Sequence, residues 1–97
     1  MISYSFHPEA EAELEDASLF YESRMLGLGK SFAAEVERTI YLIREFPDAG
    51  SPTGRTRRRV LVARFPYSVV YRRDPDAVVI VAIAHQRRRP GYWRQRK

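Results

Sequence analysis

The first part of the chain changes from an alternating apolar pattern to a helical one. Residues 2–6 alternate between large apolar side chains and serines, which predicts a short, half-buried strand. From Pro8 onward, apolar residues recur every three or four positions, and this spacing is typical of an amphipathic helix. The opening turns carry carboxylates that suit the positive end of a helix dipole, namely Glu9, Glu11 and Glu13. We therefore predict a helix over about residues 8–25, with Gly27 just beyond its end.

A second apolar stripe at helical spacing follows almost at once. Its members are Phe32, Val36, Ile40 and Ile43. Pro47 ends this second helix after Phe46. Because only a few residues separate the two helices, we expect them to pack as an antiparallel hairpin. Residues 48–54 contain a proline and two glycines, which predicts a loop.

Strand patterns fill the rest of the chain. Residues 57–65 and 67–73 each read as a strand, and Pro66 marks a bend between them. The sequence Asp74-Pro75-Asp76 is typical of a turn. Residues 78–84 are apolar at every position, which indicates a central strand that is covered on both faces. We predict an α+β fold: an N-terminal strand, a helical hairpin, and a three-stranded antiparallel meander on which the helices pack.

The length of 97 residues predicts one domain, and no internal repeat is visible. The absence of cysteine excludes disulfides and thiolate metal sites. No apolar run is long enough to span a bilayer, and the first residues lack the pattern of a signal peptide. These features predict a cytoplasmic protein that does not bind membranes.

Charge is divided unevenly along the chain, although its net value is only +5. Residues 1–54 carry ten acidic and four basic side chains, whereas residues 55–97 carry two acidic and thirteen basic ones. Many like charges in one half repel each other unless an acidic partner neutralises them. We therefore predict a basic binding surface on the second half, for nucleic acid or for an acidic protein segment. The candidate target-binding residues are Arg57, Arg58, Arg59, Arg64, Arg72, Arg88 and Arg89.

Candidate chemistry lies where the last strand ends. His85 is placed to act as an acid or base, or to form a local hydrogen bond that fixes the chain as it leaves the sheet. Trp93 and Tyr92 are able to stack on bases, but Trp93 is better suited to pin the chain end onto the core. His7, just before a helix, is interpreted as a cap or surface residue. No phosphate loop, dinucleotide motif, zinc spacing or nucleophile elbow is present, so we expect no metal or cofactor.

A chain-long set of short motifs resembles the RelE/ParE superfamily, and most closely its ParE or plasmid-stabilisation branch. In chain order the motifs are His7-Pro8-Glu9-Ala10, then Phe32, Ile40 and Phe46-Pro47, then Arg59-Val60-Leu61, then Phe65-Pro66-Tyr67-Ser68-Val69-Val70-Tyr71, and last His85-Gln86-Arg87-Arg88-Arg89-Pro90-Gly91-Tyr92-Trp93. The superfamily comprises toxins of type II toxin–antitoxin modules. The resemblance implies a helical hairpin on a small, mainly antiparallel sheet. It also implies growth arrest that a cognate antitoxin neutralises by forming a hetero-oligomer with the toxin.

The resemblance leaves two targets open. ParE-type members poison DNA gyrase and need no catalytic residue. RelE-type members cut mRNA on the ribosome, and in that case His85, Arg87 and Tyr92 would be the catalytic residues here. Two departures favour the ParE type. Ser68 stands where nucleases often have an arginine. The lysines that some nuclease members use are also absent, because the only lysines here are Lys30 and Lys97. Whether the protein is an enzyme depends on this choice, and a binding module that has lost toxicity is a third alternative.

Overall fold

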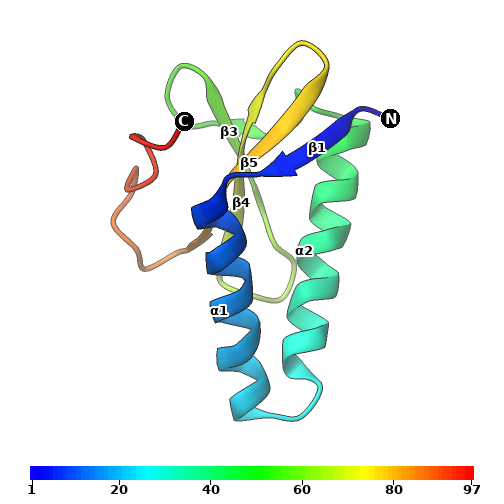
Figure 1. The fold of residues 1–97 in the computed structure, drawn as a ribbon, viewed down its shortest axis with the longest axis vertical. Coiled ribbons are helices and arrows are strands. Elements are labelled where there is room, and N and C mark those ends of the chain that lie inside the picture. Colours follow the sequence, from blue (N-terminus) through cyan, green and yellow to red (C-terminus); the bar gives the residue numbers. More distant parts are fainter.

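The computed structural model describes residues 1–97 as two helices packed on one face of a five-stranded sheet (Figure 1). The strands are β1 (Ser3–Phe6), β2 (Ser51–Pro52), β3 (Arg57–Leu61), β4 (Tyr67–Arg73) and β5 (Ala77–His85). The helices are α1 (Pro8–Arg24) and α2 (Leu28–Glu45). The predicted fold class, helical hairpin and central strand are confirmed. Neither helix combines the length and the apolar character that crossing a membrane requires.

The two helices begin and end where local chemistry favours it. The Nδ1 atom of His7 accepts a hydrogen bond from the backbone N–H of Glu9 at 3.1 Å, so His7 is the N-terminal cap of α1, as predicted. At the hairpin, the carboxylate of Glu22 accepts the backbone N–H groups of Gly27 and Gly29 at 2.8 and 2.9 Å. These hydrogen bonds lower the pKa of Glu22, because they favour its charged form. The absence of a side chain at Gly29 allows α2 to approach α1, since a Cβ there would lie 2.4 Å from the Ser18 carbonyl oxygen.

The sheet has the strand order β1-β5-β4-β3-β2. Strands β3, β4 and β5 form the predicted antiparallel meander, and β1 adds to the outer edge of β5 in parallel. Two details of the prediction were wrong. The expected loop over residues 48–54 contains the two-residue strand β2, which pairs with Arg58 and Arg59. Strand β3 ends at Leu61 rather than at residue 65, because the chain turns through Arg64, whose φ of 72° lies in the left-handed region.

The main core lies between the helices and the sheet. Phe32 of α2 is fully buried, and its ring lies 5.1 Å from that of Phe65 and 4.8 Å from that of Tyr67, measured between centroids. Tyr21 of α1 joins the same cluster, with its ring 5.2 Å from that of Phe32. The contacts of Phe32 with Phe65 and Tyr67 are edge-to-face, and such contacts add to the stability that burial of the aromatic surface provides. These aromatic residues hold the helical hairpin and the β3–β4 turn together.

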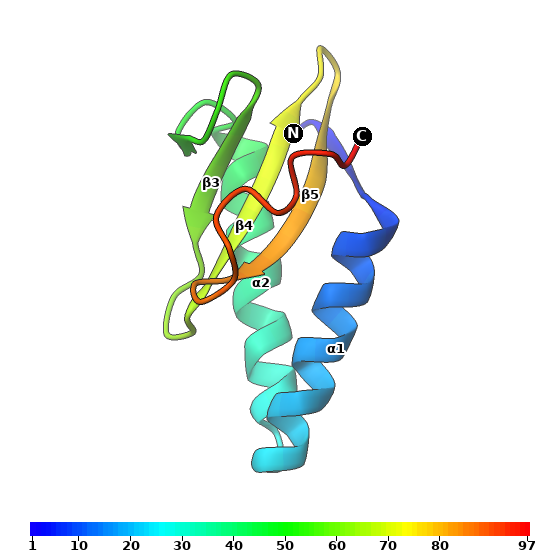
Figure 2. The same cartoon turned by 90° about the vertical axis from the view of Figure 1, so that its left-hand side faces the viewer.

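A second, smaller core covers the opposite face of the sheet. Its cover is the segment 86–97, which we call the tail, and which crosses the sheet on the face away from α2 (Figure 2). Trp93 is only 5% exposed and packs against a cluster that the strands supply, namely Val70, Val81, Ala82 and Ala84. Strand β5 is therefore covered on both faces, as its continuous apolar sequence predicted.

Candidate functional site

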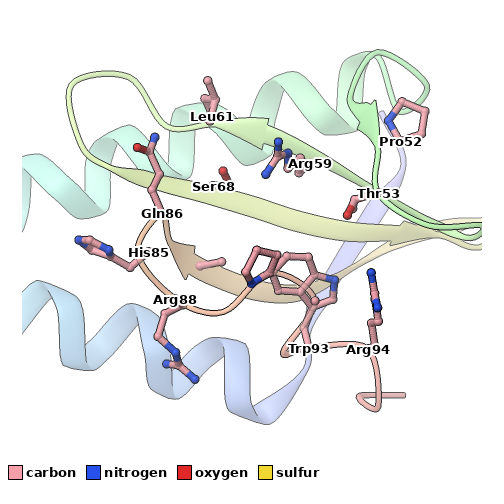
Figure 3. A pocket seen from close by; sticks show the side chains of 13 residues that line it. Pro52, Thr53, Arg59, Leu61, Ser68, His85, Gln86, Arg88, Trp93 and Arg94 are labelled. Atoms are coloured by element: carbon pink, nitrogen blue, oxygen red, sulfur yellow. The ribbon is translucent and has the colours of Figure 1, made fainter.

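A groove of about 510 Å³ lies between the sheet and the tail (Figure 3). One wall comes from β3 and β4 and is lined by Arg59, Leu61 and Ser68. The facing wall comes from the end of β5 and from the tail, and its residues include His85, Gln86, Arg88, Trp93 and Arg94. The lining contains three arginines and one histidine but no carboxylate. A space with this charge favours an acidic ligand.

The strand register divides the predicted arginines between the two faces of the sheet. Arg59 is paired with Val70, whose side chain belongs to the core under the tail, so Arg59 faces the groove. Arg58 is paired with Tyr71 of the helix-side core, and its Nη1 donates to the carbonyl of Gly50 at 2.7 Å. Arg58 thus holds the loop before β2, on the face opposite the groove.

Two further arginines of the sheet are used to hold the tail. The Nη2 of Arg57 donates to the carbonyl oxygen of Arg96 at 2.5 Å. Arg72 donates to the carbonyl oxygen of Lys97 and forms an ion pair with Asp74 at 3.1 Å. Both guanidiniums therefore already have partners within the chain, and their predicted part in target binding stays a prediction.

Three of the predicted residues outside the groove are exposed. Arg64 lies in the turn after β3, with its side chain 69% exposed and its Nη1 3.8 Å from a carboxylate oxygen of Glu35. Arg87 and Arg89 are exposed on the tail and do not line the groove. Of the ten predicted site residues, the groove brings together Arg59, His85 and Arg88.

His85 forms the local hydrogen bond that was one of its two predicted roles. Its Nδ1 accepts the backbone N–H of Arg87 at 2.9 Å, and its ring packs edge-to-face on Tyr67 with centroids 4.9 Å apart. These contacts fix the chain as it leaves the sheet, so the predicted local hydrogen bond is confirmed. Because Nδ1 is occupied as an acceptor, only Nε2 is left to contact a ligand.

Tyr92 is engaged with α1 rather than free in the groove. Its hydroxyl donates to Oε2 of Glu13 at 2.6 Å, and the guanidinium of Arg88 stacks 3.9 Å from its ring centroid. Burial, together with the hydrogen bond to Glu13, raises the pKa of Tyr92 above the ordinary value for tyrosine. Trp93 has the pinning role that its sequence position predicted.

With this arrangement in view, comparisons with known proteins identify the family. A family model described as the ParE toxin of type II toxin–antitoxin system, parDE, matches residues 4–90. The chain belongs to this family. A chain of the solved structure titled "Chromosomal ParDE TA system from P. aeruginosa" has the same fold, with a TM-score of 0.76 at 19% sequence identity. The match covers 88% of this chain and 96% of that one. A comparison with curated protein sequences found no match.

The protein is therefore a ParE-type toxin of a type II toxin–antitoxin system, which implies a cognate antitoxin as its partner. The resemblance on which the sequence analysis relied is confirmed. Each motif that carried it has a structural place: the His7 cap, the Pro47 helix end, the β3–β4 hairpin and the tail. No group of three or more His, Asp or Glu side chains is placed to hold a metal ion in this ParE toxin.

Sequence reasoning missed three residues of this region. Arg94 lines the groove, whereas Glu13 and Arg96 form an ion pair beside it at 2.9 Å. In the sequence Glu13 is only one of several carboxylates in the opening turns of a helix, which is a common position for a carboxylate. No local signal links Glu13 with Arg96, because they are far apart in the chain and become neighbours only when the tail folds back.

Proposed function

We propose that this ParE toxin arrests growth by binding DNA gyrase through the groove between the sheet and the tail. Support for gyrase comes from the family, since ParE-type toxins act on this enzyme. Support for the groove comes from its three arginines, none of which is paired with a carboxylate inside it. On this proposal the toxin acts in the cytoplasm and is kept inactive as a hetero-oligomer with its antitoxin.

The state of Tyr92 favours binding over RNA cleavage. A tyrosine that assists phosphodiester cleavage must reach the substrate with its hydroxyl, and it must be able to exchange a proton. Here the hydroxyl is bound to Glu13 at 2.6 Å, and its raised pKa disfavours loss of the proton. Ser68, the residue that stands where nucleases often have an arginine, lines the groove with a neutral side chain. The engagement of the Tyr92 hydroxyl with Glu13 is the observation on which we base the choice of a non-enzymatic toxin.

We assign contact with the target to Arg59, Arg88 and Arg94, whose side chains line the groove. Arginine suits this role because its planar guanidinium binds carboxylates and phosphates with two parallel hydrogen bonds. Arg64 and Arg89 are exposed, and we propose that they add to the same positive field. Such peripheral charges affect the rate of association more than the strength of the final complex.

An assay of DNA supercoiling by purified gyrase tests the proposal. Wild-type toxin is expected to inhibit supercoiling, and Arg59→Gln and Arg88→Gln are each expected to weaken inhibition about tenfold or more. Arg38→Gln is the matched control, because Arg38 is exposed on α2 and does not line the groove. Adding the antitoxin should restore supercoiling.

Primer extension on transcripts from induced cells distinguishes gyrase inhibition from the alternative of mRNA cleavage. Intact transcripts in arrested cells are the expected result. New cuts at codons, together with gyrase that retains full activity in the presence of toxin, would reject the proposal in favour of a ribosome-dependent nuclease. Normal growth after induction without the antitoxin would instead indicate a binding module that has lost toxicity.

A further inference from the structure

The outer edge of β5 is only half covered by a strand. Strand β1 pairs with β5 from Ala77 to Ile80 and then leaves the sheet, with a last hydrogen bond from the His7 N–H to the Ile80 carbonyl at 2.8 Å. Beyond that point the carbonyl of Val81 and the N–H of Ile83 have no neighbouring strand. Buried backbone groups of this kind need other partners.

Two side chains take the place of the missing strand. Oε1 of Glu13, from α1, accepts the N–H of Ile83 at 3.0 Å. Nη1 of Arg96, from the tail, donates to the carbonyl of Val81 at 3.0 Å. The edge of the central strand is thereby completed by one residue from a helix and one from the tail.

Glu13 and Arg96 also bind each other in a parallel fork. Nη1 and Nη2 of Arg96 donate to Oε1 and Oε2 of Glu13, each at 2.9 Å. The two side chains are nearly buried, with 16% of Glu13 and 9% of Arg96 exposed. The hydroxyl of Tyr92 occupies a further site on the same carboxylate. A paired, bidentate arrangement in a low-dielectric setting is strong and strictly oriented.

The tail depends on such anchors because it forms no strand. Its backbone makes only one-turn hydrogen bonds within itself, such as Arg94 N–H to Gly91 carbonyl at 3.0 Å and Arg96 N–H to Trp93 carbonyl at 2.9 Å. Yet this segment supplies the groove wall that carries Arg88, Trp93 and Arg94. The position of the wall therefore depends on the packing of Trp93 and on the contacts made near the chain end, where Arg96 binds Glu13. The carbonyl oxygens of Arg96 and Lys97 are held there as well, by the guanidiniums of Arg57 and Arg72.

We propose that Glu13 and Arg96 are positioning residues, which lock the tail over the sheet and so hold the groove in the shape that the target recognises. Neither residue lines the groove. The inference rests on the proposed function in one respect, namely that the groove is the surface that contacts the target. It does not depend on gyrase being that target, because growth arrest serves as a readout.

The variants Arg96→Gln and Glu13→Gln test the lock. Trp93 is the only tryptophan of the chain, so its fluorescence reports the tail directly. We expect its emission to shift to longer wavelength and the tail to become sensitive to protease, while far-ultraviolet circular dichroism stays that of the wild type. Growth arrest, and inhibition of the target in vitro, should weaken about tenfold or more. Arg96→Lys retains the charge but not the fork, and an intermediate effect is expected.

Two controls separate positioning from a general loss of stability. Val36→Ala weakens the helix-side core without touching the tail, because Val36 is buried between α2 and the sheet. If Val36→Ala lowers the melting temperature as much as the Arg96 and Glu13 variants do, it should still leave the Trp93 emission and the toxicity unchanged. Arg38→Gln controls for the loss of one arginine charge.

The possible outcomes are distinguishable. A released tail with wild-type toxicity, in a protein whose Arg59→Gln variant is inactive, would overturn the positioning role and leave the groove as the site. Loss of toxicity in both Arg96→Gln and Glu13→Gln, with gyrase unaffected by wild-type toxin, would support the positioning role of the pair and reject gyrase as the target. Global unfolding of both Arg96→Gln and Glu13→Gln would overturn the inference, because the pair would then hold the whole fold.

Discussion

Tyr71→Phe removes one oxygen atom from the helix-side core and tests how the segment between α2 and β2 is held. Tyr71 is fully buried on β4. Its hydroxyl donates to the carbonyl of Pro47 at 2.7 Å and accepts the N–H of Gly50 at 3.2 Å. These two bonds fix the segment that follows α2 and leads into β2. Phenylalanine keeps the ring, so the substitution deletes the two hydrogen bonds and leaves almost no cavity.

The expected loss follows from the surroundings of the two partners. Gly50 is buried, so its N–H bears most of the cost of an unpaired donor, whereas Pro47 is half-buried and water can replace the hydroxyl there. An unpaired buried group costs about 1–3 kcal/mol, which gives about 2 kcal/mol for the pair of bonds. For a chain of this size that loss lowers the melting temperature by about 8–16 °C.

Urea denaturation and a thermal melt followed by circular dichroism measure this difference. Tyr41→Phe is the matched control, because Tyr41 is 52% exposed on α2, and it should change the free energy of unfolding by less than about 0.5 kcal/mol. A Tyr71→Phe protein as stable as the Tyr41→Phe protein would refute the reasoning. It would mean that the loop is not held by the Tyr71 hydroxyl.

Three further predictions concern stability. Ile80→Asp should abolish folding, seen as loss of circular dichroism, because Ile80 is fully buried in β5 and an unpaired charge there has no partner; a folded, soluble variant would contradict the central position of β5. Phe32→Ala should cost about 3–5 kcal/mol in urea denaturation, and a loss below about 1 kcal/mol would argue against the aromatic cluster. The pKa values of Tyr71 and Tyr92 are raised in the folded protein, so their contribution to stability is complete below the free tyrosine pKa of about 10 and declines above it. The melting temperature should therefore fall as the pH rises beyond that value. An unchanged melting temperature there would count against both environments.

Periodicity sufficed to predict the elements with regular and strong patterns. The predicted strand over residues 67–73 has the observed bounds of β4, because turn residues delimit it on both sides. The run at residues 78–84 lies within β5, and its apolar character on both faces correctly indicated two covers. For the second cover, the sequence predicts only a chain end pinned by Trp93, whereas the structure shows the tail lying across the sheet.

The features that sequence could not supply all depend on distant parts of the chain. The parallel pairing of β1 with β5 brings Ser3 beside Ala77, which is far away in the chain, and no local pattern records it. Strand β2 has two residues and includes Pro52, so it carries no strand signal of its own. The division of the arginines, with Arg58 on one face and Arg59 on the other, required the register of β3. Arg57 looked free for a target in sequence, but it binds the tail, which lies beside β3 only in the folded chain.

The most direct test of the central proposal measures covalent gyrase–DNA cleavage complexes formed by purified gyrase with the toxin added. Cleavage complexes should accumulate with wild-type toxin, decrease with Arg59→Gln and Arg88→Gln, and disappear when the antitoxin is present. The Arg38→Gln toxin should act like the wild type, because Arg38 lies on α2 outside the groove. Gyrase that supercoils and religates DNA normally in saturating active toxin would contradict the proposal that this ParE toxin acts on gyrase.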